Sequence, residues 1–81
     1  MTKREKRFEN ILKGNQASYR FADIRNFLEH HGFKVKMKGS SHCIFRKEPY
    51  PHITLVIHHN KIKGFYVKRA VQIMKDYEII S

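Results

Sequence analysis

The segment from Lys38 to Phe45, which reads KGSSHCIF, contains the side chain best suited to acid–base chemistry, His42. It follows a Gly-Ser-Ser turn and lies in the chain between two cations, Lys38 and Arg46. A histidine with a pKa near ~6.5 can accept or donate a proton at neutral pH. RNA is cleaved without a metal when a 2′-hydroxyl attacks the adjacent phosphate, one group moves its proton and a cation stabilises the added charge. His42 is therefore a candidate general acid or base, although a turn histidine without a chemical role has the same surroundings.

The other histidines and the single cysteine indicate no second chemistry. His30 and His31 are adjacent, as are His58 and His59, so the members of each pair point in different directions. No His-x-x-x-His spacing and no Cys-x-x-Cys motif is present, so we expect neither a metal nor a cofactor. Cys43 has no paired base and is expected to be a small core residue. A single cysteine excludes an intrachain disulfide and suits a reducing cytoplasm.

The charge balance favours a phosphate-bearing partner. The chain has 81 residues and a formal net charge of +10, which draws a small protein to nucleic acid or to an anionic membrane. No apolar run approaches the ~18 residues of a membrane span, the N-terminus lacks the apolar region of a secretory signal, and no segment has the pattern of an interfacial helix. RNA or DNA is therefore the favoured partner over a membrane, while a basic protein that is simply soluble, or that binds an acidic protein, stays possible.

Helical spacing predicts two helices in the first part of the chain. Residues 3–13 place Phe8, Ile11 and Leu12 on one face, and Gly14 ends this segment. Ser18 is expected to cap a second helix over residues 19–31, whose apolar stripe consists of Phe21, Ile24, Phe27, Leu28 and His31. Gly32 occupies the position of a left-handed cap.

The period then changes to two, which predicts strands over residues 33–38, 42–48 and 52–58. A polar loop with the sequence HNKIKG follows, and a last helix over residues 65–77 is expected to bury Val67, Ala70, Val71, Met74 and Tyr77. Short turns make consecutive strands antiparallel neighbours. The sequence thus predicts one α+β domain over residues 1–81, in the order α-α-β-β-β-α, with a three-stranded antiparallel sheet and helices on one face. Residues 1–16 form an additional N-terminal helix and turn.

The other face of this sheet is expected to be open and basic. Strand parity places these residues on it: Lys34, Lys36, Lys38, His42, Ile44, Arg46, Thr54 and Val56. Lysines at period two repeat every ~7 Å, which suits successive phosphates, although lysines also protect an exposed strand from aggregation. Lys61, Lys63, Lys68 and Arg69 gather around the start of the last helix, where a phosphate would be favoured.

The run FLEHHGFKVKMKGSSHCIF resembles the HicA family of type II toxin–antitoxin systems. Its members have a helix that ends in Gly-Phe, a basic strand, and a Gly-Ser-His motif followed by an apolar residue and Phe. Here these are Gly32-Phe33, residues 34–38, Ser41-His42 and Ile44-Phe45, with one additional serine in the turn. The tail NKIKGFYVKRAVQIMKDYE is similar to a branch with a Lys-x-Lys loop before its last helix, so the resemblance covers nearly the whole chain.

The resemblance implies a fold like that of double-stranded RNA-binding domains and a ribosome-independent, metal-independent endoribonuclease that cleaves mRNA. It implies an essential His42 and a HicB-type antitoxin that covers the active face, for which Ile44 and Val56 provide apolar contacts. The expected RNA-binding residues are Lys36, Lys38, Ser41, Arg46, Lys61, Lys63, Tyr66, Lys68 and Arg69. A non-catalytic RNA-binding module is the alternative. A DNA-binding regulator ranks lower because a sheet follows the second helix directly, which leaves no helix-turn-helix pair.

Overall fold

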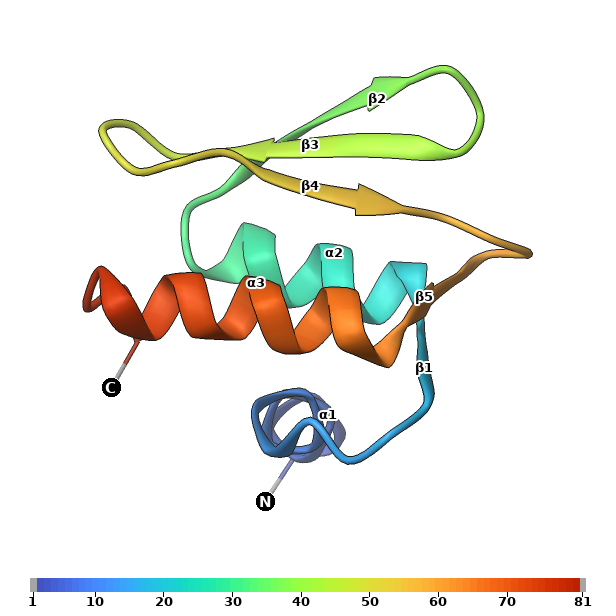
Figure 1. Cartoon of the computed structure of the whole chain (residues 1–81). Helices are drawn as coiled ribbons and strands as arrows, with labels where there is room; N and C mark the ends of the chain where they lie inside the picture. The colour runs from blue at the N-terminus through green and yellow to red at the C-terminus, as the bar shows by residue number, and fades with distance from the viewer. Residues whose placement is uncertain (1, 81) are drawn as a thin grey trace.

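Three strands form an antiparallel sheet in the order β2-β3-β4 in the computed structural model, which describes residues 2–80 (Figure 1). They are β2 (Lys34–Lys38), β3 (His42–Arg46) and β4 (Ile53–Val56). Phe45 pairs with Val35 on one side and with Ile53 on the other, and Cys43 pairs with Leu55. Because side chains alternate across a strand, these residues face the same side. Cys43, Phe45 and Leu55 are at most 1% exposed, which confirms the predicted parity of β3 and β4.

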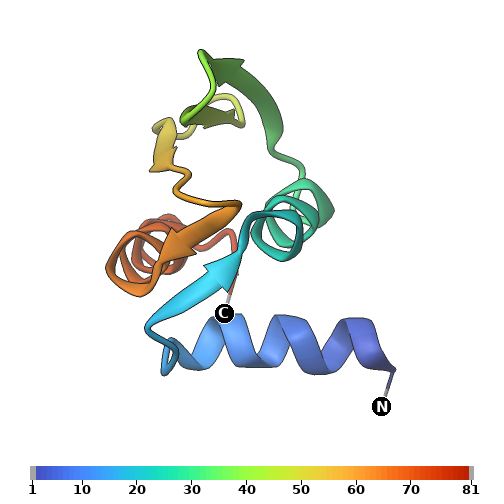
Figure 2. The same ribbon diagram turned by 90° about the vertical axis from the view of Figure 1, so that its right-hand side faces the viewer.

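Two helices cover the inner face of this sheet. They are α2 (Phe21–His30) and α3 (Gly64–Asp76), and they lie side by side beneath the strands (Figures 1 and 2). The third helix, α1 (Lys3–Lys13), packs on the side of α2 and α3 that faces away from the sheet (Figure 2). Within residues 2–80 no element covers the outer face of the sheet (Figure 1). The predicted α+β class, the three-stranded sheet and the open face are therefore confirmed.

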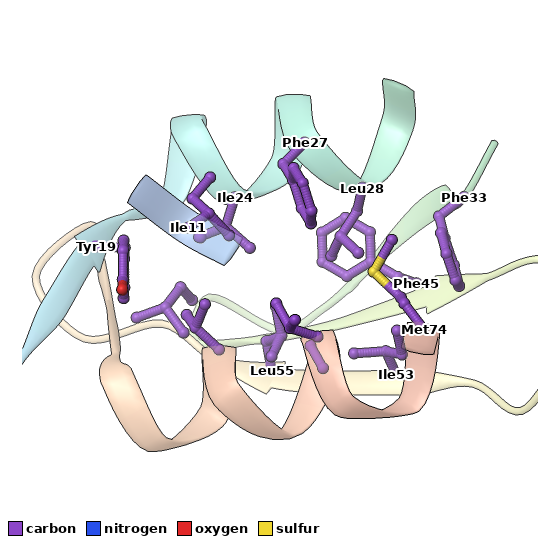
Figure 3. Packing of buried hydrophobic residues seen from close by; sticks show 14 of the residues in the cluster. Ile11, Tyr19, Ile24, Phe27, Leu28, Phe33, Phe45, Ile53, Leu55 and Met74 are labelled. Atoms are coloured by element: carbon purple, nitrogen blue, oxygen red, sulfur yellow. The ribbon is translucent and has the colours of Figure 1, made fainter. Parts of the chain in front are cut away.

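The core joins all three layers (Figure 3). Ile24, Phe27 and Leu28 from α2 meet Met74 from α3, and Ile11 from α1 joins the cluster next to Ile24. Each of these side chains is at most 2% exposed. The apolar stripes of the sequence thus predicted the buried faces of α2 and α3, because a helix repeats its face every three to four residues. In α1 the predicted face is buried only in part, since Leu12 is 38% exposed.

A two-stranded ribbon is the main departure from the predicted fold. β1 (Ser18–Arg20) pairs antiparallel with β5 (Lys61–Lys63), and Tyr19 and Ile62 turn inward with 5% and 0% exposed. The prediction that Ser18 caps a helix is wrong, because residues 18–20 are extended and α2 begins only at Phe21, without a side-chain cap. The prediction of a polar loop at HNKIKG is also wrong, because Ile62 anchors a strand there.

One predicted burial is wrong, and one further apolar residue at a strand end is exposed. Tyr77 is 50% exposed, because α3 ends at Asp76 and the chain turns back through Glu78, whose φ is 57°. Its ring instead packs edge-on against Tyr50, with centroids 6.0 Å apart. Met37 is 43% exposed, because the end of β2 turns away from the helix layer (Figure 1).

None of the helices within residues 2–80 is both long and apolar enough to span a bilayer.

Candidate functional site

His42 occupies the middle of a cross-strand row on the open face. The register pairs it with Lys38 of β2 and with Val56 of β4, so these three residues lie abreast; we call them the His42 row. Directly paired residues have Cβ atoms ~5 Å apart. A three-residue turn over 39–41, in which Gly39 has a φ of 69°, closes the hairpin between Lys38 and His42. The additional serine therefore leaves the histidine and the lysine on the same face.

The imidazole of His42 has one side-chain hydrogen-bond partner among residues 2–80. Ser41 Oγ lies 3.4 Å from His42 Nδ1. The backbone around this contact is fixed, because the Ile57 N–H donates to the Ser41 carbonyl at 2.7 Å. Since His42 is exposed and Nδ1 is engaged, Nε2 is the ring nitrogen that can meet a ligand.

The predicted phosphate-binding residues of the sheet lie at different distances from His42. Lys38 lies beside His42, and Lys36 is one row away, opposite Ile44. Arg46 pairs with Lys34 at the other end of β3, four residues and hence ~13 Å from His42. The Arg46 guanidinium also forms an ion pair with Glu48, with Nη2 and Oε1 3.9 Å apart. Lys36 and Lys38 therefore lie near His42, whereas Arg46 lies at the far end of the strand.

Acidic residues are absent from the strands of the open face, and Glu48 beside Arg46 is the one acidic residue in the chain between Glu29 and Asp76. The sequence contains no Asp or Glu between Glu29 and Glu48, and none between Glu48 and Asp76. Within the part of the chain that the structure describes, Lys34, Lys36 and Lys38 have no ion-pair partner. An unpaired row of cations gives a positive potential that attracts phosphates.

A second group of cations lies on the outer face of the β1–β5 ribbon. The register pairs Ser18 with Lys63 and Arg20 with Lys61, while Tyr19 and Ile62 between them point inward. Arg20 is absent from the predicted RNA-binding residues, because the sequence predicts a helix cap at Ser18 and a helix from residue 19 onward. The alternation of polar and apolar residues in SYR and KIK was the available signal.

Lys63 and Tyr66 reach the edge of the sheet next to the His42 row. Together with Val56 and His58 they line a hollow of about 200 Å³. Val56 thus belongs both to the His42 row and to this hollow. His58 was also missed, although it continues the period-two pattern of β4; its backbone exchanges hydrogen bonds of 2.8 and 3.0 Å with Lys61.

Lys68 and Arg69, which were grouped at the start of the last helix, face different neighbours. Arg69 lines a hollow of about 90 Å³ with Tyr66, beside His52 and Thr54 at the edge of β4. Lys68 instead lies over Gly14, against the end of α1. Only Arg69 is therefore on the side of α3 that adjoins the sheet edge.

Two titratable groups have shifted pKa values, and neither belongs to the open face. Burial raises the pKa of the Cys43 thiol, which is fully enclosed in the core. Partial desolvation, with the nearby charges of Arg4 and His31, lowers the pKa of His30, whose Nδ1 contacts the Arg4 guanidinium. Across residues 2–80, no three His, Cys, Asp or Glu side chains form a group that could hold a metal ion.

Comparison with protein-family models, with curated proteins and with solved structures gives no match to this chain.

Proposed function

We propose that this protein is an endoribonuclease of the HicA toxin type that cleaves mRNA without a metal, with His42 as its general acid or base. The observation that carries the proposal is the His42 row, in which the register sets an exposed imidazole directly beside Lys38 on a face without acidic residues. The sequence motif around His42 supports the same residue.

The proposed reaction needs a group that transfers a proton and a cation beside the phosphate. The 2′-oxygen of a nucleotide attacks the adjacent phosphorus while the 5′-oxygen of the next nucleotide leaves, which yields a 2′,3′-cyclic phosphate and a free 5′-hydroxyl. His42 takes the proton of the attacking hydroxyl or supplies the proton of the leaving oxygen. Lys38, with Lys36 one row away, neutralises the charge on the phosphate as it rises.

The same face suits an inhibitory partner. Ile44 and Val56 are half-buried apolar residues within an otherwise polar and basic surface. A small acidic antitoxin of the HicB type, in the same cytoplasm as the mRNA substrate, would cover them and screen the lysines at once. The proposed antitoxin therefore competes with RNA for the His42 row.

Cleavage of a labelled mRNA by the purified protein in EDTA tests the catalytic assignment. We expect the wild-type protein to cut the RNA and His42→Ala to lose about 10²–10⁴-fold in rate. His30→Ala is the matched control, because His30 is also an exposed histidine but lies on α2, on the far side of the helix layer from the open face. Equal cleavage by wild-type protein and His42→Ala would show that His42 is not the catalytic group.

A non-catalytic RNA-binding module is the second candidate. It is favoured by one observation: the only side-chain partner of His42 within residues 2–80 is a hydroxyl, so no second titratable group is paired with it. This candidate predicts that the same RNA is shifted in a native gel but stays intact, and that binding weakens steeply with salt.

A further inference from the structure

The free edge of β4 and the first turns of α3 enclose a groove that continues from the His42 row. The two hollows described above, of about 200 and 90 Å³, both have Tyr66 in their walls. Val56 connects the larger hollow to His42 through the strand register. In Figure 1 this region lies where α3 passes beneath β4. We call it the β4–α3 groove.

The helical side of the groove has a regular arrangement of charge and aromatic surface. Tyr66 and Arg69 lie three residues apart on α3 and therefore on the same face of the helix. Lys63 is the last residue of β5, immediately before α3, and it shares one hollow with Tyr66, while Arg69 shares the other. Tyr66 thus lies between two cations, neither of which has an ion-pair partner within residues 2–80.

The strand side supplies polar groups at period two. His52, Thr54 and His58 are exposed and line the groove at the edge of β4. The distance from residue 52 to residue 58 is ~20 Å along an extended chain. No acidic residue lines either hollow.

We propose that the β4–α3 groove binds the unpaired strand of an RNA substrate next to the scissile phosphate, with a base stacked on Tyr66 and phosphates on Lys63 and Arg69. Aromatic platforms between cations bind single strands because every base has a face to stack and every nucleotide a phosphate. The hollows are smaller than the ~300 Å³ at which pockets for drug-sized ligands begin, so each admits one base or phosphate rather than a duplex. This inference rests on the proposed function only for its link to cleavage at His42.

Binding of a non-cleavable RNA tests the groove separately from the chemistry. The probe is a fluorescent single-stranded oligonucleotide with 2′-O-methyl groups throughout, compared with the same sequence as a duplex. We expect the wild-type protein to favour the single strand. Tyr66→Leu should weaken binding about tenfold, whereas Tyr66→Phe, which keeps the ring, should stay within about twofold.

Arg69→Gln and Lys68→Gln form a matched pair. Both remove one positive charge from neighbouring exposed positions of α3, but only Arg69 lines the groove, since Lys68 lies over Gly14. Arg69→Gln should weaken binding and reduce the slope of log K against log salt by about 0.7, the value for one phosphate contact on a single strand. Lys68→Gln should change the slope much less. Circular dichroism of each variant checks that it is folded.

The outcomes distinguish this inference from the proposed function. One outcome is that the wild-type protein cleaves RNA, while Tyr66→Leu and Arg69→Gln bind the oligonucleotide as tightly as Tyr66→Phe and Lys68→Gln do. This result would contradict RNA binding in the β4–α3 groove but would support the proposed nuclease activity. If binding depends on the groove residues but the RNA is not cleaved, RNA binding in the β4–α3 groove is supported and the proposed nuclease activity is contradicted. A preference for the duplex would also contradict the groove.

Discussion

Within residues 2–80, the Ser41 hydroxyl is the one side-chain group in hydrogen-bond contact with the proposed catalytic imidazole. Its contact with His42 Nδ1 is long, at 3.4 Å, and both residues are accessible to solvent. Such a contact biases the tautomer and the ring orientation without creating a strongly coupled pair. Ser41 is thus a positioning residue whose removal should weaken cleavage but not abolish it.

We predict that Ser41→Ala lowers kcat about fivefold, the effect of losing one neutral hydrogen bond of ~1 kcal/mol. Because the hydroxyl acts through His42, KM should stay nearly constant and the pH profile of kcat should shift. Ser40→Ala is the control, since Ser40 is an exposed neighbour in the same turn. A fall in RNA affinity without a change in kcat would instead identify Ser41 as a binding residue.

Cys43 follows His42 in the chain but has the opposite environment. It is 0% exposed, and burial raises the pKa of its thiol. The unfolded thiol ionises near ~8.5, so above that pH the unfolded chain loses a proton that the folded protein keeps. The raised pKa therefore contributes stability that is complete below pH ~8.5 and is lost as the pH rises toward the folded value.

We predict that the free energy of unfolding falls between pH 8 and 10 more steeply for the wild-type protein than for Cys43→Ala, as measured by urea denaturation. In the same pH range the folded protein should react with iodoacetamide far more slowly than the protein in urea, because the thiolate is the reactive form and the thiol is enclosed. Rapid alkylation of the folded protein would contradict the burial of Cys43.

At the scale of elements, sequence periodicity succeeded where a segment was long enough to show a period. Residues 34–38, 42–46 and 53–56 alternate clearly, and parity alone placed His42, Lys36 and Lys38 on one face. β1 and β5 have three residues each, too few for alternation to be distinguished from a helix cap or a loop. Their pairing joins positions 18 and 63, which no local pattern could reveal.

The sequence could also not show which side of α3 each cation faces. Lys68 and Arg69 are adjacent and equally basic, and only the packing of α1 against α3 separates them. The same holds for Arg20, whose partner Lys61 is remote in the chain. The residues predicted from strand parity thus lie where expected, whereas those near the last helix needed the tertiary structure.

Gly64 marks the place where the ribbon and α3 meet. Its N–H donates to the Ala17 carbonyl at 2.7 Å. A Cβ at this position would overlap the Gln16 carbonyl oxygen and would lie 3.2 Å from that of Ala17. Both neighbours are backbone atoms, so they cannot move aside as a flexible side chain would.

We predict that Gly64→Ala destabilises the protein by about 1–3 kcal/mol, even though alanine is the better helix former. The melting temperature should fall by roughly 4–8 °C for each kcal/mol. Gly39→Asn is the control: the turn at Gly39 has open space, and asparagine tolerates its φ of 69°. A melting temperature unchanged by Gly64→Ala would mean that the chain between α1 and α3 is less closely packed than described.

At the scale of the whole molecule, the acidic residues are distributed unevenly over the layers, and none lies on a strand of the open face. The acidic residues lie on the helices, in the loop after β3 and at the end of α3: Glu5, Glu9, Asp23, Glu29, Glu48, Asp76 and Glu78. The open face has lysines without acids, whereas cations on α1 and α2 include members of ion pairs, such as Lys13 with Glu9 at 3.2 Å.

This asymmetry predicts that the position of a charge, and not the net charge, decides RNA affinity. Lys36→Gln with Lys38→Gln, and Lys3→Gln with Lys6→Gln, each lower the net charge of +10 by two, but the first pair lies on the open face and the second on α1. The sheet variant should lose two phosphate contacts, so its slope of log K against log salt should fall by about 1.4 for single-stranded RNA. The α1 variant should keep the wild-type slope, because its lysines lie on the opposite side of the helix layer (Figure 2). Anisotropy titrations over a series of salt concentrations measure both slopes, and equal slopes for the two variants would mean that RNA is attracted by the overall charge and not held by the open face.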